Sequence, residues 1–228
     1  NSRPDIACAI AQSTQVTDTR FEANPGTHVK VLNAVLTHLK KVPDLLLRFP
    51  QLDVETLRLQ IYSDASYGNN ADDSSQLGYI IFLADNAGLC QPLVWSSHKS
   101  RRVTRSVLGS ETMAFADAFD MAYSLKHDIQ KITGKKIPLI HLTDSLSLFD
   151  VITKSSTTAE KRLMIDLEVV KEAYKSRELE KIGFIRTEYN PADALTKVVR
   201  CSVLESILRE ARISHPIEQW VNRSSGVL

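Results

Sequence analysis

Alternating apolar and polar residues predict a strand over residues 57–67. Leu57, Leu59 and Ile61 alternate with polar side chains, which is the period of a strand with one buried face. The alternation stops at residues 63–66, and turn-forming residues follow. Asp64 therefore stands at the end of a core strand, where a carboxylate is held rigidly and still meets solvent and metal. The alternative is that Asp64 only opens the turn.

Further apolar runs predict the rest of the architecture. Strands are expected at 77–83, 92–96, 137–143 and 183–189, with a short additional strand at 45–49. Helical spacing is expected over the first 41 residues, at 107–132, 146–152 and 158–177, and from 190 to about 213 with a break. Three antiparallel strands followed by βα units predict an α/β fold, with a five-stranded mixed sheet flanked by helices.

Composition adds little about partners. The 228 residues are 43% hydrophobic and 24% charged, which suits one or two globular domains with a sizeable core. The net charge of +1 means that any nucleic-acid signal must be local. Cys8, Cys90 and Cys201 are odd in number and scattered, which predicts reduced thiols in an intracellular protein. No membrane span or signal peptide is visible, and because the first residue is Asn1 we expect a piece of a longer protein.

Three more acidic residues stand near the ends of predicted elements. Glu111 lies near the start of the long helix on its apolar face, and Asp144 follows the fourth strand of the sheet. Asp193 falls in the first turn of a helix that Asn190 caps and Pro191 begins. Each has a structural alternative: a first-turn acid favoured by the helix dipole for Glu111, a helix N-cap for Asp144, and the capping motif itself for Asp193.

Taken together, the four acids predict a metal site. If the first and fourth strands of the sheet are adjacent, Asp64 and Asp144 lie side by side near one edge. Clustered carboxylates repel one another unless cations neutralise them, and hard oxygen ligands select Mg²⁺ or Mn²⁺. Two such ions about 4 Å apart activate a water and stabilise the leaving oxygen of a phosphodiester. The sequence therefore predicts metal-dependent phosphodiester cleavage.

A basic run at residues 97–105 precedes the helix that carries Glu111. It contains no acid and includes His98, Lys99, Arg101, Arg102 and Arg105. Such a run is usually a solvated loop, but beside the carboxylates it is predicted to bind a phosphate backbone. Lys161 and Arg162, on a later helix, are predicted to add a second contact.

Several motifs, in this order, resemble the ribonuclease H domain of copia-type LTR retrotransposon Pol polyproteins. They are Tyr62–Ala65, Ser75–Tyr79, Trp95–Lys99, Ser110–Ala114, Asp144–Ser147, Ile165–Leu167 and Ala192–Lys197. The Trp95 and Ala192 motifs are the most specific. Residues 1–56 resemble the end of the reverse transcriptase and its helical connection, so we expect a ribonuclease H domain at 57–212 and a tail at 213–228.

The resemblance implies the ribonuclease H-like fold and hydrolysis of the RNA strand of an RNA–DNA hybrid with two Mg²⁺ ions, which Mn²⁺ can replace. It implies that Asp64 bridges both ions, that Asp193 helps to hold the ion that activates water, and that Glu111 and Asp144 hold the ion on the leaving-group side. It also implies the reverse transcriptase portion of the same polyprotein as a partner and a cytoplasmic location, in a virus-like particle, or a nuclear one.

Ser66 and Ser145 join the basic residues as predicted nucleic-acid contacts.

The chain also departs from the family. Gly109 stands where a second acid is usual, Ser145 stands where Asn is common, and the loop before Asp193 lacks a His. The resemblance implies that Ser145 in place of Asn weakens a contact to the hybrid. It also implies that product release relies on another group, because the loop before Asp193 lacks the His. No Tyr-x-Asp-Asp polymerase motif occurs, so we expect no DNA synthesis.

Two other functions stay open from the sequence. One is another nuclease of the same fold, such as a resolvase or an integrase, although an integrase would place its Glu last along the chain. The other is a non-catalytic, domesticated binding or scaffolding domain.

Overall fold

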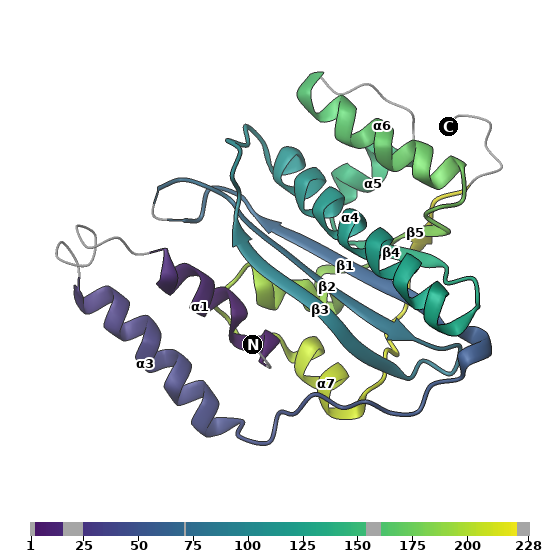
Figure 1. Cartoon of the computed structure of the whole chain (residues 1–228). Helices are drawn as coiled ribbons and strands as arrows, with labels where there is room; N and C mark the ends of the chain where they lie inside the picture. Colours follow the sequence, from purple (N-terminus) through teal and green to yellow (C-terminus); the bar gives the residue numbers. More distant parts are fainter. Residues whose placement is uncertain (1–2, 16–24, 71, 154–160, 223–228) are drawn as a thin grey trace.

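The computed structural model describes residues 3–15, 25–70, 72–153 and 161–222, and within them the strands form one mixed sheet (Figure 1). The strand order is β3-β2-β1-β4-β5-β6. β2 is antiparallel to both β1 and β3, β4 is parallel to β1 and β5, and β6 is antiparallel to β5. The strands are β1 (Arg58–Ser66), β2 (Gln76–Ala84), β3 (Cys90–Lys99), β4 (Leu139–Thr143), β5 (Lys181–Phe184) and β6 (Gln219–Trp220). The predicted α/β class and mixed sheet are confirmed, with six strands where five were expected.

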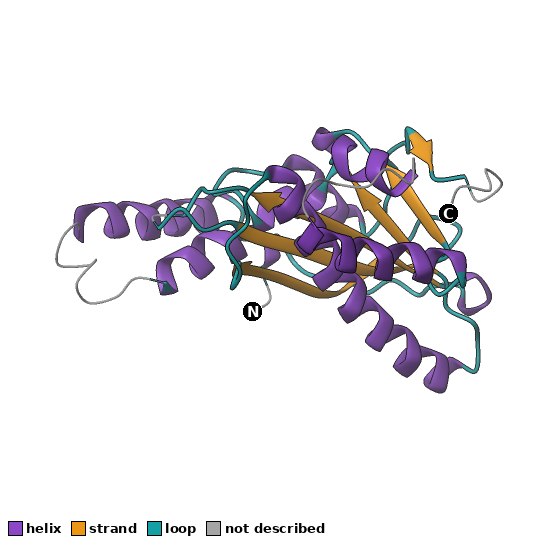
Figure 2. Cartoon of the chain, turned by 90° about the horizontal axis from the view of Figure 1, so that it is seen from above, coloured by secondary structure: helices purple, strands orange, loops and turns teal. Residues whose placement is uncertain are grey.

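Helices cover both faces of the sheet (Figures 1 and 2). One layer contains α4 (Val107–Thr133), α5 (Leu146–Thr153) and α6 (Lys161–Lys175). The other contains α1 (Ala7–Thr14), the 3₁₀ helix η4 (Pro191–Leu195) and α7 (Ser202–Glu210). Each layer has its own core, because the two buried clusters share no residue.

Strand β1 is buried on both faces. Leu59 and Ile61 pack in the core under α4, while Tyr62 packs in the core under α7. Gln60 is also buried, and its Nε2 donates to the Tyr62 hydroxyl at 2.6 Å. The prediction of a strand with one solvent-facing side is therefore wrong, because the polar members of the alternation are covered by the second layer.

Local sequence signals set the ends of α4, the helix that carries Glu111. The Ser106 hydroxyl accepts a hydrogen bond from the Gly109 N–H at 3.0 Å, which satisfies a free donor of the first turn. Gly134 ends the helix in a left-handed conformation (φ 67°), and its N–H donates to the Gln130 carbonyl at 2.8 Å. Both ends agree with the sequence prediction to within one residue.

Residues 45–49 form no strand. Leu45 is buried in the α7-side core, whereas Leu46 and Phe49 are more than 60% exposed. The outer strand β3 pairs with β2 alone, and the chain directly after this segment contacts β3 through a side chain rather than a ladder, since Gln91 Nε2 donates to the Pro50 carbonyl at 2.6 Å. An apolar run alone did not distinguish an extended connection from a strand.

The C-terminal third differs from the prediction in its boundaries. β5 spans Lys181–Phe184 rather than 183–189, because its partner β4 ends at Thr143, which pairs with Phe184. Residues Thr187–Tyr189 form a 3₁₀ turn, η3. The predicted final helix is two helices, η4 and α7, separated at residues 196–201.

From the sequence, the polar tail after Pro216 was expected to be loosely held unless Trp220 docked it, and residues 219–222 are docked on the sheet. β6 pairs with β5, with Trp220 opposite Gly183. The Tyr174 hydroxyl donates to the Val221 carbonyl at 2.6 Å. The sixth strand comes from this part of the tail.

The N-terminal residues form a 3₁₀ turn η1 (Pro4–Ile6), α1, α3 (Pro25–Lys41) and a second 3₁₀ turn η2 (Val54–Thr56). α1 packs on β3 and η4, and α3 packs on α1. The division at residues 56 and 212 stays a prediction. Among the described residues, no helix combines the length and apolar character that crossing a bilayer requires.

Candidate metal centre

Asp64 lies inside β1, opposite Gly78 of β2, and is only 3% exposed. The alternative that it opens a turn is therefore wrong. β1 and β4 are adjacent as predicted, with Tyr62 opposite Leu142. Because the two strands are parallel, their carboxyl ends meet at one edge, and Asp144 follows the end of β4 beside Asp64.

The missing side chain at Gly78 brings η4 close to Asp64. A Cβ on Gly78 would lie 2.7 Å from Leu195 Cβ and 2.9 Å from Thr196 Cγ2, both tighter than a normal contact. The turn that follows η4 therefore packs directly on the sheet beside Asp64. There the Thr196 hydroxyl donates to Asp64 Oδ2. The 3₁₀ helix that carries Asp193 is fixed to β1 in this way.

Asn190 connects three parts of the site. Its Nδ2 donates to Asp144 Oδ1 at 2.8 Å and to the Ser63 carbonyl at 3.0 Å. Its Oδ1 accepts from the Ala192 N–H at 3.1 Å, which is the predicted N-cap contact. Asn190 is completely buried, so it positions Asp144 against both β1 and η4. The cap was predicted from the sequence, but the contact with Asp144 was not.

The alternative reading of Asp144 as a helix N-cap does not describe this chain. The next residue, Ser145, caps α5, since its hydroxyl accepts from the Leu148 N–H at 3.3 Å and its carbonyl accepts from the Phe149 N–H at 3.0 Å. The Asp144 carboxylate therefore does not cap α5 and lies beside the other acids.

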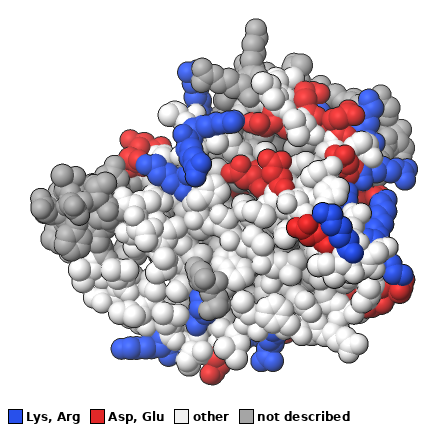
Figure 3. All heavy atoms as spheres, in the orientation of Figure 1, with Lys and Arg blue, Asp and Glu red and all other residues white. Residues whose placement is uncertain are grey.

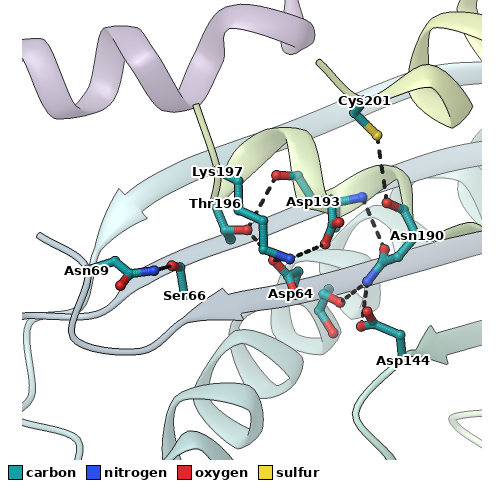
Figure 4. Close-up of polar contacts among 11 residues, drawn as sticks. Asp64, Ser66, Asn69, Asp144, Asn190, Asp193, Thr196, Lys197 and Cys201 are labelled. Carbon is teal, nitrogen blue, oxygen red and sulfur yellow. Dashed lines mark hydrogen bonds and ion pairs between the residues drawn. The ribbon is translucent and has the colours of Figure 1, made fainter. Parts of the chain in front are cut away.

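Asp64, Asp144 and Asp193 each offer a carboxylate oxygen, and these atoms all lie within 4.8 Å of one another (Figure 4). The three side chains come from β1, from the end of β4 and from η4, and they converge on one point. Carboxylates gathered this closely are the ligand set that Mg²⁺ and Mn²⁺ prefer. The residues present therefore fit a divalent cation.

Glu111 is the fourth predicted acid, and it lies beside this group without being one of the three. It is 6% exposed, and its Oε2 has no hydrogen-bond partner in the described part of the chain. Burial raises its pKa to about 9, and the charges of Asp64 and Asp144 add to that increase. The charge of Lys197 and a hydrogen bond from the Ala65 backbone oppose it. A buried acid with an oxygen left unpaired beside other acids is a further observation that fits a cation.

Lys197 enters the cluster and was missed by the sequence analysis. Its Nζ lies 2.8 Å from Asp193 Oδ1 and 3.8 Å from Asp64 Oδ2, and Figure 4 shows the side chain reaching down between them. The sequence contained a signal for the contact between Lys197 and Asp193, because the two residues stand four apart in the motif Ala192–Lys197.

Electrostatics in the site follow from burial and crowding. Burial raises the pKa of Asp64 to about 6; the charges of Asp193 and Asp144 act in the same direction and Lys197 opposes them. Burial likewise raises the pKa of Asp193 despite its contact with Lys197. For Lys197, burial lowers the pKa, but the surrounding carboxylates outweigh it and the net shift is upward. The site therefore favours bound positive charge.

The predicted basic contacts are largely paired with acids. His98 and Lys99 lie in β3 rather than in a loop, and they contact Asp117 (3.1 Å) and Asp72 respectively. Arg102 lies 3.6 Å from Asp166. Figure 3 accordingly shows basic and acidic groups interspersed rather than one continuous basic surface.

Arg101 and Arg105 differ from the other basic residues of this run. Both are exposed, and no ion pair joins either to an acid among the described residues. They are the two whose charge is available to an external phosphate.

The other predicted nucleic-acid contacts are less accessible or not described. Ser66 is buried, and its hydroxyl accepts from the Asn69 side chain. Ser145 is partly exposed and caps α5. Lys161 and Arg162 begin α6, and their side chains lie outside the described part of the structure.

The chain is similar in sequence to Pol polyproteins of transposons. It is 28% identical over 201 residues to the retrovirus-related Pol polyprotein from transposon TNT 1-94 of Nicotiana tabacum, covering 87% of this chain and 14% of that protein. It is 26% identical over 144 residues to the transposon Ty1-ER2 Gag-Pol polyprotein of Saccharomyces cerevisiae, covering 62% of this chain and 8% of that protein. The predicted resemblance to the ribonuclease H domain of a retrotransposon Pol polyprotein is confirmed. The chain spans about a seventh or less of the length of these relatives.

Among solved structures, the chain is similar to RNase H1 from Halobacterium salinarum, with a TM-score of 0.43, 16% identity, and coverage of 65% of this chain and 98% of that one. It is also similar to the N-terminal RNase H domain of Rv2228c from Mycobacterium tuberculosis, with a TM-score of 0.45, 19% identity, and coverage of 68% and 99%. No family model matches the chain. The ribonuclease H-like fold is read from the strand order and directions of its own sheet.

Proposed function

We propose that this chain is a metal-dependent ribonuclease H that hydrolyses the RNA strand of RNA–DNA hybrids during retrotransposon reverse transcription. The observation that carries the proposal is the convergence of Asp64, Asp144 and Asp193 at the edge where β1 and β4 end, with buried Glu111 beside them. The similarity to transposon Pol polyproteins supports the same function.

The four acids have distinct parts in the proposal. Asp64 and Asp193 would hold one divalent ion, and Asp64, Asp144 and Glu111 would hold a second. When bound, two such ions lower the pKa of a coordinated water and neutralise charge on the attacking and leaving oxygens of the phosphodiester. Asn190 keeps Asp144 directed at the cluster through its 2.8 Å hydrogen bond. Thr196 does the same for Asp64.

The substrate is held by charge at the rim of the site. Arg101 and Arg105 stand on the loop that connects β3 to α4, and α4 carries Glu111. Guanidinium groups bind phosphate oxygens with two donors each, which suits them to a nucleic-acid backbone. This contact positions the substrate without reading its sequence. The reverse transcriptase portion of the same polyprotein is the proposed partner that delivers the hybrid.

The test is an incubation of the purified chain with Mg²⁺ or Mn²⁺ and three labelled substrates: an RNA–DNA hybrid, a DNA duplex and a four-way DNA junction. We expect cleavage of the RNA strand of the hybrid alone, and loss of all cleavage in EDTA. Cleavage of the junction or the duplex instead would mean that the chain is a nuclease of another class.

A non-catalytic scaffold is the second candidate, and Lys197 favours it. An ammonium 2.8 Å from Asp193 and 3.8 Å from Asp64 offsets part of the acidic charge without any metal. Binding of the hybrid without cleavage at any Mg²⁺ or Mn²⁺ concentration would select this candidate.

Replacing Arg101 and Arg105 together with Ala should weaken hybrid binding and reduce the slope of log affinity against log salt by about one for each phosphate that these arginines neutralise. The matched control is Lys40→Ala with Lys41→Ala, which removes the same charge from the exposed last turn of α3. Fluorescence anisotropy with a labelled hybrid, at several salt concentrations, measures both quantities. An unchanged slope in the arginine variant would mean that this loop is only a solvated surface.

A further inference from the structure

Lys197 is held where a cation would bind. Its Nζ contacts Asp193 Oδ1 at 2.8 Å and approaches Asp64 Oδ2 at 3.8 Å, and both acids belong to the group of three converging carboxylates. An oxygen that accepts a hydrogen bond from an ammonium at 2.8 Å cannot offer the same lone pair to a metal ion. The lysine is therefore in the position of a counter-ion to the cluster.

The backbone fixes this position. Lys197 follows η4, and its N–H donates to the Asp193 carbonyl at 3.0 Å. The preceding residue, Thr196, is held between the Asp64 carboxylate and Gly78. The lysine cannot leave the neighbourhood of the cluster, but its long side chain can turn away from it.

There is room for that movement. The Lys197 side chain is 38% exposed, so one side of it already faces solvent. A cavity of about 110 Å³ also adjoins the residue; its lining includes the apolar side chains Ala9, Ala194 and Val198 and the charged or polar side chains Asp5, His38, Arg200 and Glu205. The methylene stem can pack against the apolar part of this lining while the ammonium stays solvated.

We propose that Lys197 is a built-in counter-ion that a divalent cation must displace from Asp193 and Asp64. This inference rests on the metal-binding part of the proposed function. Without metal, the ammonium offsets the repulsion among the acids and stabilises the folded chain. With metal, it moves aside and stays beside the cluster, where its charge is available to a phosphate group. The lysine thus lowers the affinity for the ion and stabilises the metal-free site.

The test compares wild type with Lys197→Met by isothermal titration calorimetry with MgCl₂ or MnCl₂ in the absence of nucleic acid, and by thermal unfolding in EDTA. We expect Lys197→Met to bind Mg²⁺ about tenfold more tightly, a change of ~1.4 kcal/mol, and to melt at a lower temperature without metal. Lys197→Arg retains the charge and should stay close to wild type in affinity. Lys40→Met, on the exposed surface of α3, is the control for the loss of one lysine.

Unchanged or weaker Mg²⁺ binding by Lys197→Met would overturn the inference, as would the absence of Mg²⁺ and Mn²⁺ binding in wild type and variant alike. If Lys197→Met and Lys197→Gln are unfolded in EDTA but fold in Mg²⁺, the inference is supported, because the ion then replaces the missing counter-ion. If both stay unfolded in Mg²⁺, it is wrong. A wild type that binds Mg²⁺ but cleaves no hybrid would count against the proposed function alone.

Discussion

Replacing Asp64 with Asn is expected to abolish hybrid cleavage while leaving the fold intact. Asn has the same shape but a neutral amide, so the site loses a carboxylate that is 3% exposed, lies among other acids and is proposed to bind the metal. Changes to groups that only support a metal ligand cost about 10–100-fold in activity or metal affinity, so loss of a ligand should cost at least that much. Single-turnover cleavage of a labelled hybrid measures the rate.

The structure predicts that this variant remains folded in EDTA. Burial raises the pKa of Asp64 to about 6, which means that its charge is unfavourable in the folded, metal-free chain. Removing the charge should therefore leave the melting temperature at pH 8 unchanged or higher. The matched control is Asp128→Asn, which neutralises an acid that is 66% exposed on α4. Cleavage by Asp64→Asn within tenfold of wild type would remove Asp64 from the active site.

Replacing Glu111 with Gln is expected to stabilise the metal-free chain at alkaline pH. The pKa of Glu111 is raised by burial from 4.5 to about 9, and that of Asp64 from 3.8 to about 6. The folded state therefore binds more protons than the unfolded state between these values, and stability falls as the pH rises. Lys197 does not offset this trend, because its pKa is raised from 10.5 and its charge is constant below that pH.

The size of the effect follows from the same shift. At 1.36 kcal/mol per pKa unit, Glu111 alone can cost up to about 4 kcal/mol of stability between pH 5.5 and 8.5. Urea unfolding in EDTA at the two pH values should show this loss in wild type and a smaller one in Glu111→Gln. Glu172→Gln, an exposed position on α6, is the control. If wild type and Glu111→Gln lose equal amounts of stability between the two pH values, ionisation of a buried Glu111 is not the cause of the loss.

Added Mg²⁺ provides an independent check on Glu111. Metal binding requires deprotonated carboxylates, so Mg²⁺ should raise the melting temperature of wild type more at pH 8.5 than at pH 5.5. If Glu111 belongs to the metal centre, Glu111→Gln should gain less from the ion. A variant that gains as much as wild type would place Glu111 outside the centre, in agreement with its absence from the group of three converging acids.

Local signals in the sequence determined most elements of the fold. The apolar runs located β1 to β4, and Gly134 correctly marked the end of α4. Asn190 and Pro191 predicted the start of η4, because a cap and a fixed φ depend on neighbouring residues alone. The same signals placed Asp64 on one strand and Asp144 directly after another, the two strands were expected to be adjacent, and the pairing of β1 with β4 agrees.

What the sequence could not determine depends on contacts between distant segments. Burial of Gln60 and Tyr62 follows from the second helical layer, which no period in β1 reveals. The length of β5 was set by its partner β4, and β6 formed because the tail returns to the sheet.

The site shows the same division most clearly in Lys197. Residue types and spacing selected the four acids as candidates, although each also had a structural explanation within its own element. The position of the ammonium between Asp193 and Asp64, two acids that lie far apart in the sequence, required η4 to pack on Gly78. Local chemistry marked the acids as candidates, whereas tertiary packing brought three of them together and placed the Lys197 ammonium among them, since distances across the fold are set only when the chain folds.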